Sequence, residues 1–489
     1  MYVFCWAISC DDCWLTRYDV CQVTSTSVLP DDVLLGIFDF CVDRHPVTKN
    51  EVEAWQTLVH VCRQWRTVVF GSPRRLSLRL YYSTTTQTPL DIWPALPLHI
   101  AGDVQNTEDS DNIVAVLERS NPVYHIAHSS YSPSLENILA AMQKPFPELT
   151  YLRLFLYEAV TVVPDSFLGG SAPRLQILSL DGIPFPGLPK LLLSATHLTE
   201  LNLFNIPHAG YFSPGAIATA LSMSISLRLL ILQFLSPGSY PSRHPPPLTR
   251  SVLPNLKKAM FRGVSEYLED LVALIDAPQL YSLNVALFNQ ILFDTPQFIQ
   301  FISRTPMWTA LENAHLVFKN HVAAVVLSSS NRPKYENFGV RTRILCREPD
   351  WQVSSLEQVC NSWLPSLSAL EDLYIYENSE PPPDWRDNIE NTLWLELLHP
   401  FSAAKNLYLS KEFAVRIAPA LQELVGSRTM EVLPTLQNIF VERLHPSRPA
   451  QEGTLKFVAA RQLSGHPITV SVWETYVDDV VDWDRYNLW

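Results

Sequence analysis

The sequence predicts an α/β protein in which a short all-helical segment precedes a long series of alternating strands and helices. Two observations support this prediction. A leucine spacing that suits one short strand, L-x-x-L-x-L, recurs many times between residues 149 and 441. Segments with helical periodicity separate its copies, whereas the apolar residues between 29 and 70 follow helical spacing alone. Strands that alternate with helices in this way are expected to pair in parallel.

The composition indicates a folded protein without a nucleic-acid-binding surface. The chain has 489 residues, 47% of them hydrophobic, and can bury a substantial core. Its formal net charge is −13, whereas nucleic-acid binding needs clustered Lys and Arg. No run is long enough to cross a membrane, and Met1 to Cys10 lacks the basic start of a signal peptide. We therefore expect a cytoplasmic or nuclear protein with neither a nucleic-acid nor a membrane partner.

Cysteines are concentrated at the N-terminus, where four of the eight lie in the first 21 residues. Only Cys10 and Cys13 have the C-x2-C spacing of a zinc site, and no histidine lies nearby. We interpret residues 1–24 as a poorly ordered leader, with a metal site as the less favoured alternative.

Residues 25–72 have the pattern of a small helical domain. Pro30 suits a first helical turn, and Asp31 and Asp32 place negative charge at the positive end of the helix dipole. Apolar residues then recur at helical spacing in two groups: Val33, Leu34, Ile37 and Phe38, followed by Leu58, Val61, Cys62, Trp65 and Val69. So short a segment cannot bury this much apolar surface alone, so a partner or the following domain is expected to cover part of it.

Three parts of this segment resemble the F-box: Leu29-Pro30, the aliphatic helix that follows, and Val61-Cys62-Arg63-x-Trp65-Arg66. The resemblance implies docking to the Skp-type adaptor of a cullin–RING (SCF-type) ubiquitin ligase. It assigns adaptor binding to Leu29, Pro30, Val33, Leu34, Ile37, Phe38, Leu58, Val61, Cys62, Trp65 and Arg66. The usual acidic turn and leucine between the halves are replaced by RHPVTKNEVEAW, in which we expect Trp55 to stand in for the leucine. An ordinary helical cap on the next domain is the alternative.

Strands and helices begin to alternate directly after the helical domain. Residues 76–82 alternate as a half-buried strand does, and 96–100 and 123–127 give two further strands. Helices are predicted at 113–117 and 134–142. The alternation therefore starts before the leucine repeat does.

The leucine repeat appears first as Pro147-Glu-Leu149-Thr-Tyr-Leu152-Arg-Leu154. Successive copies start at Leu149, Leu175, Leu198, Leu227, Leu256 and Leu280, at intervals between 23 and 29 residues. Each interval suits one strand and one helix. Looser copies follow at 316–318, 370–375, 404–409 and 434–441, and one more strand is predicted at 340–345. The predicted helices are 185–194, 213–222, 265–275, 297–303, 355–363, 391–398 and 413–425.

This pattern is similar to the irregular leucine-rich repeats often attached to F-boxes, and the combination resembles the F-box-like proteins expanded in mushroom-forming fungi. The resemblance implies a curved solenoid over residues 73–465 with parallel strands on its concave face. A doubly wound α/β domain is the alternative, but it does not need the fixed leucine spacing. Residues 466–489 are interpreted as a last strand and cap followed by an acidic tail. Two Pro-rich insertions, 236–248 and 380–384, are expected to be exposed loops.

We find no catalytic constellation in the sequence. Glycine-rich nucleotide loops, the G-x-S-x-G elbow and the H-E-x-x-H helix are absent. His125 and His128 lie three residues apart on a predicted strand, so they should face opposite sides and not share a metal. We therefore predict a protein that is not an enzyme and needs no cofactor and no metal.

The predicted strands offer a recognition surface instead. Side chains that flank the inward leucines point to the opposite face because strand side chains alternate. Aromatic, Arg, carboxylate and amide groups gather there, as in protein-binding surfaces. Substrate binding is assigned to Tyr151, Arg153, Phe155, Asn202, Phe204, Arg262, Tyr374, Tyr376 and Tyr408. The prediction is a substrate-recognition subunit of an SCF-type ubiquitin ligase, whose repeat domain binds a protein. A non-catalytic interaction scaffold is the alternative.

Overall fold

The computed structural model describes residues 29–473 except 43–53, 74, 77, 85–92, 105, 120, 131, 157–161, 238–249, 289–292, 294, 309–310, 330–338, 347, 363–366, 378–388, 425–427 and 443–447. The chain divides into two compact units. The first contains the chain up to Leu80 together with Pro89–Leu96, and the second contains Tyr81–Thr88 and the chain from Pro97 onward. The predicted leader, the acidic tail after Trp473 and most of both Pro-rich insertions lie outside the described residues.

Three helices are described in the first unit: α1 (Asp31–Val42), α2 (Ala54–Val59) and α3 (Arg63–Gly71). The second group of apolar residues thus spans two helices rather than one. The chain leaves helical geometry after Val59, and Cys62 is extended (φ −157°, ψ 173°). Arg66 stabilises this break because its Nε donates to the Val59 carbonyl at 3.0 Å, at the otherwise unpaired end of α2.

Aromatic side chains fill the interior of the first unit. Phe38 of α1 is fully buried and packs on Trp65 of α3. Trp55 is also buried; its indole N–H donates to the Arg79 carbonyl at 3.1 Å, and its ring centroid lies 5.2 Å from that of Trp93. Helices too short to be stable alone are therefore joined by ring packing.

A sixteen-stranded sheet dominates the described part of the second unit. The order of the strands in the sheet follows their order in the chain from β1 to β11 and from β15 to β18. Strands β8 and β10 are not part of this sheet and pair with each other. The strands are β1 (Leu80–Ser83), β2 (Leu98–Val104), β3 (Val123–Ser130), β4 (Tyr151–Leu156), β5 (Ile177–Asp181), β6 (Glu200–Ile206), β7 (Leu229–Phe234), β8 (Ser251–Val252), β9 (Lys258–Gly263), β10 (Ile275–Asp276), β11 (Ser282–Phe288), β12 (Asn313–Lys319), β13 (Val322–Ser328), β14 (Gly339–Leu345), β15 (Asp372–Glu377), β16 (Asn406–Leu409), β17 (Asn438–Glu442) and β18 (Thr469–Trp473). The predicted α/β class is confirmed.

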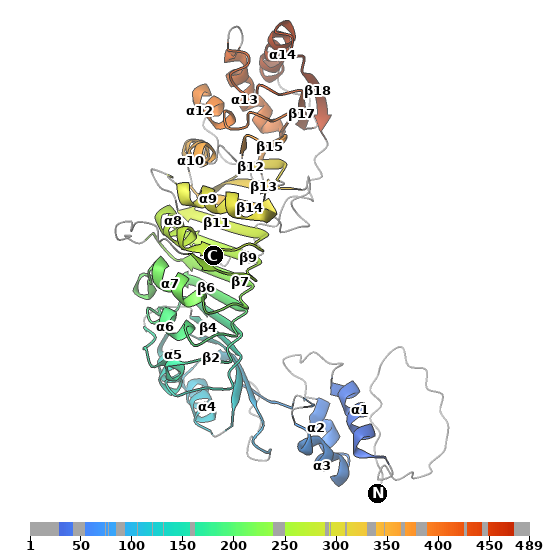
Figure 1. Ribbon diagram of the computed structural model, residues 1–489, viewed down its shortest axis with the longest axis vertical. Helices are drawn as coiled ribbons and strands as arrows, with labels where there is room; N and C mark the ends of the chain where they lie inside the picture. The colour runs from blue at the N-terminus through green and yellow to red at the C-terminus, as the bar shows by residue number, and fades with distance from the viewer. Residues whose placement is uncertain are drawn as a thin grey trace, which may run out of the picture. The chain divides into compact units, whose positions relative to one another are not determined.

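Helices of the second unit lie along one face of this sheet (Figure 1). They are α4 (Thr107–Leu117), α5 (Ser132–Ala141), α6 (Leu188–Leu192), α7 (Pro214–Leu221), α8 (Ser265–Leu274), α9 (Pro296–Arg304), α10 (Pro349–Ser362), α12 (Asn391–Leu398), α13 (Lys411–Glu423) and α14 (Arg448–Leu463), with short 3-10 turns at Phe167–Gly170, His208–Gly210 and Pro306–Trp308. Consecutive helices pack on one another, as α12, α13 and α14 do. The sequence did not predict α14, because its apolar residues are sparse and Gly453 interrupts them.

The leucine spacing explains how the sheet holds these helices. In β4, Leu152, Leu154 and Leu156 are buried, whereas the alternate side chains are more exposed. The parallel register aligns Leu152 with Leu178 of β5, and Leu178 with Leu201 of β6. Equivalent leucines therefore form continuous rows between the sheet and the helices, which buries apolar area at every repeat.

One part of the sheet departs from the predicted parallel pairing. The strand predicted at 340–345 is present as β14, but the sequence did not predict β13, which runs antiparallel to both β12 and β14. The expectation of parallel strands is therefore wrong at this insertion. Gly339 (φ +117°) starts β14, where a Cβ would lie 2.0 Å from the Leu327 carbonyl oxygen of β13. Only glycine suits so close a passage between strands.

Candidate functional site

Helix α1 of the first unit has an inner and an outer apolar face. Leu34 and Phe38 are completely buried, whereas Val33 and Ile37, one residue before each, are 44% and 42% exposed. Spacings of four and three residues place Val33, Ile37 and Phe40 on one side of the helix. With Leu29 just before the helix, they form what we call the exposed apolar stripe: Leu29, Val33, Ile37 and Phe40. Phe40 was not among the predicted residues, although its i+3 spacing from Ile37 was a usable signal.

The start of this stripe lies beside α3. The Gln64 side-chain amide donates to the Leu29 carbonyl at 3.5 Å, and the Pro30 carbonyl accepts the first backbone bonds of α1 from Val33 and Leu34. Val61, three residues before Gln64, is 55% exposed. The structure thus places several apolar side chains in solvent on one small unit, as interaction surfaces do.

The other residues predicted to bind an adaptor have internal roles. Leu58 is buried, and Cys62 is half-buried at the N-cap of α3 without a side-chain capping bond. Trp65 is half-buried against Phe38, and its indole nitrogen has no hydrogen-bond partner among the described residues. Arg66 is exposed but caps α2. The accessible part of the predicted set is therefore Leu29, Pro30, Val33, Ile37, Val61 and Arg66.

The second unit carries the predicted substrate-binding residues on the sheet face opposite the helices, which we call the open face. On β4, β6 and β16 they alternate with buried leucines, whereas Tyr374 of β15 is itself buried, with 6% of its surface exposed. Through β5, the register aligns Arg153 with Asn202 and Phe155 with Phe204. Tyr151 is the first residue of β4, whereas Arg262 is on β9. The structure places the remaining three, Tyr374, Tyr376 and Tyr408, on β15 and β16.

Rings stack across strands at the N-terminal end of the open face. The His99 and His125 ring centroids are 3.7 Å apart, and those of His125 and Tyr151 are 4.0 Å apart. His128 points to the other side of the sheet, where it is buried with its Nδ1 3.0 Å from the Gly102 carbonyl. Burial lowers the pKa of His128, and this hydrogen bond opposes the effect. His125 and His128 therefore face opposite sides, as alternation predicts.

A second ring stack lies on β12, β15, β16 and β17, and we call it the aromatic column: His315, Tyr374, Tyr408 and Phe440. Successive ring centroids are 4.4, 4.2 and 4.5 Å apart, with ring planes within 10° of parallel. His315 is buried, and neither of its ring nitrogens has a hydrogen-bond partner among the described residues. Burial, with a smaller contribution from the charge of Arg341, lowers the pKa of His315 to about 3. The column therefore contains a neutral imidazole at neutral pH.

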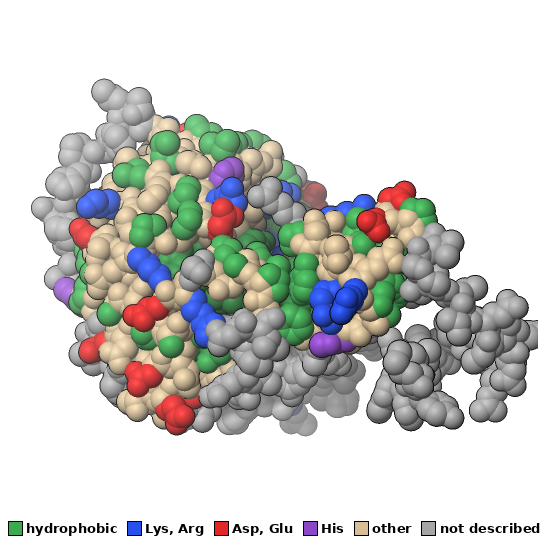
Figure 2. Space-filling view, turned by 90° about the horizontal axis from the view of Figure 1, so that it is seen from below, with side chains coloured by type: hydrophobic (Ala, Val, Ile, Leu, Met, Phe, Trp, Pro, Cys, Tyr) green, Lys and Arg blue, Asp and Glu red, His purple; other side chains and the backbone are tan. Residues whose placement is uncertain are grey.

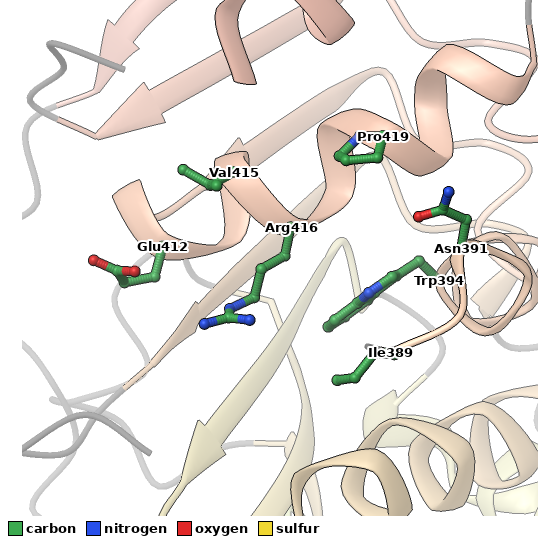
Figure 3. Close-up of a pocket in the computed structure, with 7 residues that line it drawn as sticks. All are labelled: Ile389, Asn391, Trp394, Glu412, Val415, Arg416 and Pro419. Atoms are coloured by element: carbon green, nitrogen blue, oxygen red, sulfur yellow. The ribbon is translucent and has the colours of Figure 1, made fainter. Parts of the chain in front are cut away.

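A pocket of about 200 Å³ opens between α12 and α13, on the helical side of the sheet (Figure 3). Its described lining residues are Ile389, Asn391, Trp394, Glu412, Val415, Arg416 and Pro419. Pro419 lies inside α13 and has no N–H to donate to the Val415 carbonyl. The seven residues include no Ser, Thr, Cys or His that could serve as a nucleophile or as a paired base. The described lining therefore offers no nucleophile–base pair of the Ser–His or Cys–His kind.

Charge is dispersed over the surface that Figure 2 shows, where Lys and Arg side chains lie singly or in small groups among hydrophobic and neutral ones. A continuous basic band, which nucleic-acid binding uses, is not seen on this face. The described residues contain no group of three or more His, Cys, Asp or Glu side chains suited to a metal ion. No helix in the described part of the chain has the length and apolar character needed to span a membrane.

Comparisons with known proteins identify no family for this chain. The sequence matches no protein-family model, and it matches no curated protein.

Proposed function

We propose that the chain is a substrate-recognition subunit of an SCF-type ubiquitin ligase, whose first unit docks a Skp-type adaptor through the exposed apolar stripe. In this proposal the first unit is an F-box-like domain. The second unit is an irregular leucine-rich-repeat solenoid that binds a protein substrate on its open, concave face. The subunit catalyses no bond chemistry, and it raises the ubiquitin-transfer rate by proximity in the cytoplasm or nucleus.

The observation that carries the proposal is the division of α1 into two apolar faces. A helix that only supported its own unit would need one apolar face, and Leu34 and Phe38 supply it. Val33, Ile37 and Phe40 are additional, exposed and in line. The sequence places them next to Leu29-Pro30 and upstream of Val61-Cys62-Arg63-x-Trp65, which is the arrangement of the F-box resemblance.

The repeat domain supports the second half of the proposal. Parallel strands in chain order with helices on one face leave a broad open face, and that face carries tyrosine, arginine and amide side chains. Such residues are enriched where proteins bind one another. A doubly wound sheet would instead have helices on both faces.

Co-expression with a Skp-type adaptor followed by size-exclusion chromatography tests the proposal. The wild-type chain should elute as a one-to-one complex with the adaptor, and the complex should recruit a cullin. Val33→Asp should abolish co-elution because it places a charge in the apolar contact. Leu193→Asp, which changes an exposed apolar residue of the second unit, is the matched control and should co-elute normally.

A wild-type chain that elutes alone while remaining folded would contradict adaptor docking. That result would favour the alternative function, an interaction scaffold whose helical unit has no adaptor.

A further inference from the structure

The aromatic column lies in a polar setting on the open face. Beside it, the Asn406 side-chain amide donates to Asp372 at 2.6 Å, and that of Asn438 donates to Asn406 at 2.7 Å. The hydroxyl of Thr469 donates to Asn438 in turn. This hydrogen-bonded row fixes the positions of β15 to β18 relative to one another. The column is therefore held in place, with His315 and Tyr374 buried and Tyr408 and Phe440 half-buried.

Trp473, the last residue of β18, lies across this column. The next position of the column in register is Ser471, which has no ring, so the stack ends at Phe440. Trp473 is paired with Glu442, yet its ring centroid lies 5.6 Å from that of Tyr408 and 5.8 Å from that of Tyr374. The interplanar angles of 68° and 60° are those of edge-to-face contacts.

The indole of Trp473 thus shows what the column accepts: one aromatic side chain in edge-to-face contact with two stacked phenols. Trp473 remains half-buried, so it covers the column without being enclosed by it. An edge-to-face pair contributes modestly, so a side chain held by two such contacts can be displaced.

A carboxylate lies beside the indole. Glu442 has the same strand parity as Phe440 and is in register with Trp473. Its side chain accepts the backbone N–H of Lys411 at 3.4 Å. A positively charged group on a ligand would therefore be attracted to Glu442.

We propose that the aromatic column binds a peptide segment in which an aromatic side chain adjoins a Lys or Arg, and that Trp473 occupies the site until such a peptide displaces it. The aromatic side chain takes the place of the indole, and the cation faces Glu442. This proposal rests on the proposed function only in identifying the peptide as part of the ligase substrate.

The test is a saturation-transfer NMR titration of the full chain with the peptides Gly-Ser-Trp-Arg-Ser-Gly, Gly-Ser-Ala-Arg-Ser-Gly and Gly-Ser-Trp-Glu-Ser-Gly. Only the first should bind measurably. Trp473→Ala should tighten its binding about tenfold, because the internal competitor is removed. Tyr408→Leu should weaken it, whereas Tyr81→Leu, which alters a tyrosine beside the other ring stack, should leave it unchanged.

Two results would overturn the proposal: failure of Gly-Ser-Trp-Arg-Ser-Gly to bind the Trp473→Ala variant, or equal affinities for wild type, Trp473→Ala and Tyr408→Leu. The Trp473→Ala prediction is a gain of binding, which misfolding cannot imitate. Adaptor co-elution of the same variants is measured in parallel. Retained co-elution with failed peptide binding would reject the column site alone, and lost co-elution of the wild type would reject adaptor docking.

Discussion

Phe38 on α1 and Trp65 on α3 pack edge to face, with ring centroids 4.9 Å apart and ring planes at 62°. Both residues belong to the F-box-like pattern, and this contact shows that part of the pattern holds the unit together rather than facing a partner. Ile37, the neighbour of Phe38, points to solvent instead. Adjacent residues of one pattern thus have separable roles, which substitutions can distinguish.

Phe38→Ala should destabilise the first unit by about 3–5 kcal/mol, because it removes a buried ring and leaves a cavity beside Trp65. Ile37→Ala should change the free energy of unfolding by no more than about 0.5 kcal/mol. Urea denaturation followed by tryptophan fluorescence measures both. Equal destabilisation by the two substitutions would show that Ile37 is a core residue and would remove the basis for the exposed stripe.

Glu269 of α8 caps the next helix along the sheet. Its two carboxylate oxygens accept the backbone N–H groups of Gln297 and Phe298 at 2.8 Å each, at the first turn of α9, and the side chain is buried. Glu269→Gln keeps the volume but turns one acceptor into a donor, so an N–H group of α9 loses its partner. We expect a loss of about 1–3 kcal/mol in the free energy of unfolding.

Chemical denaturation of Glu269→Gln checks this value, with Glu118→Gln, an exposed glutamate at the end of α4, as the control. The control should stay within about 0.5 kcal/mol of wild type. If both variants were equally stable, the carboxylate of Glu269 would not be a helix cap.

His315 should make the chain sensitive to acid. Its pKa is lowered from 6.5 to about 3 in the folded state, so the unfolded state binds the extra proton between these pH values. The neutral His315 side chain therefore costs no stability well above pH 6.5. The free energy of unfolding falls as the pH drops from 6.5 towards 3. Between pH 7.5 and 5 the loss amounts to about 2 kcal/mol, because each pKa unit corresponds to about 1.36 kcal/mol.

His315→Phe keeps the ring stack with Tyr374 and has no proton to bind. Its stability relative to wild type should therefore rise by about 2 kcal/mol between pH 7.5 and pH 5, as measured by urea denaturation at each pH. Parallel pH profiles of the two proteins would contradict the neutral, buried state of this imidazole. His128 is retained in both proteins, so its own titration cancels in the comparison.

Strands could be predicted from the sequence where a periodic pattern of leucines determines their position. The leucine spacing located β4, β5 and β6 because equivalent leucines fill equivalent positions. It did not predict β13, since Val322 to Leu327 is uniformly apolar and shows no alternation by which to assign a face or a direction.

Two features of the candidate site depend on tertiary packing and could not be read from spacing. Val33, Leu34, Ile37 and Phe38 fit a single stripe equally well, and only the ring of Trp65 decides which pair faces inward. Likewise, Trp473 contacts Tyr408 and Tyr374 although the register pairs Ser471, not Trp473, with Phe440. Ser471 and Trp473 lie on the same face of β18, so alternation does not show which of them reaches the column.

Isothermal titration calorimetry of the purified chain with a Skp-type adaptor tests most directly whether the exposed apolar stripe is a docking surface. Wild type should bind, and Ile37→Asp should weaken binding about a hundredfold, equivalent to about 2.7 kcal/mol, because a carboxylate would be buried without a partner. Ile225→Asp, which changes an exposed isoleucine of the second unit, should bind like wild type. Equal affinities of Ile37→Asp and wild type, or no binding by the folded wild-type chain, would contradict adaptor docking.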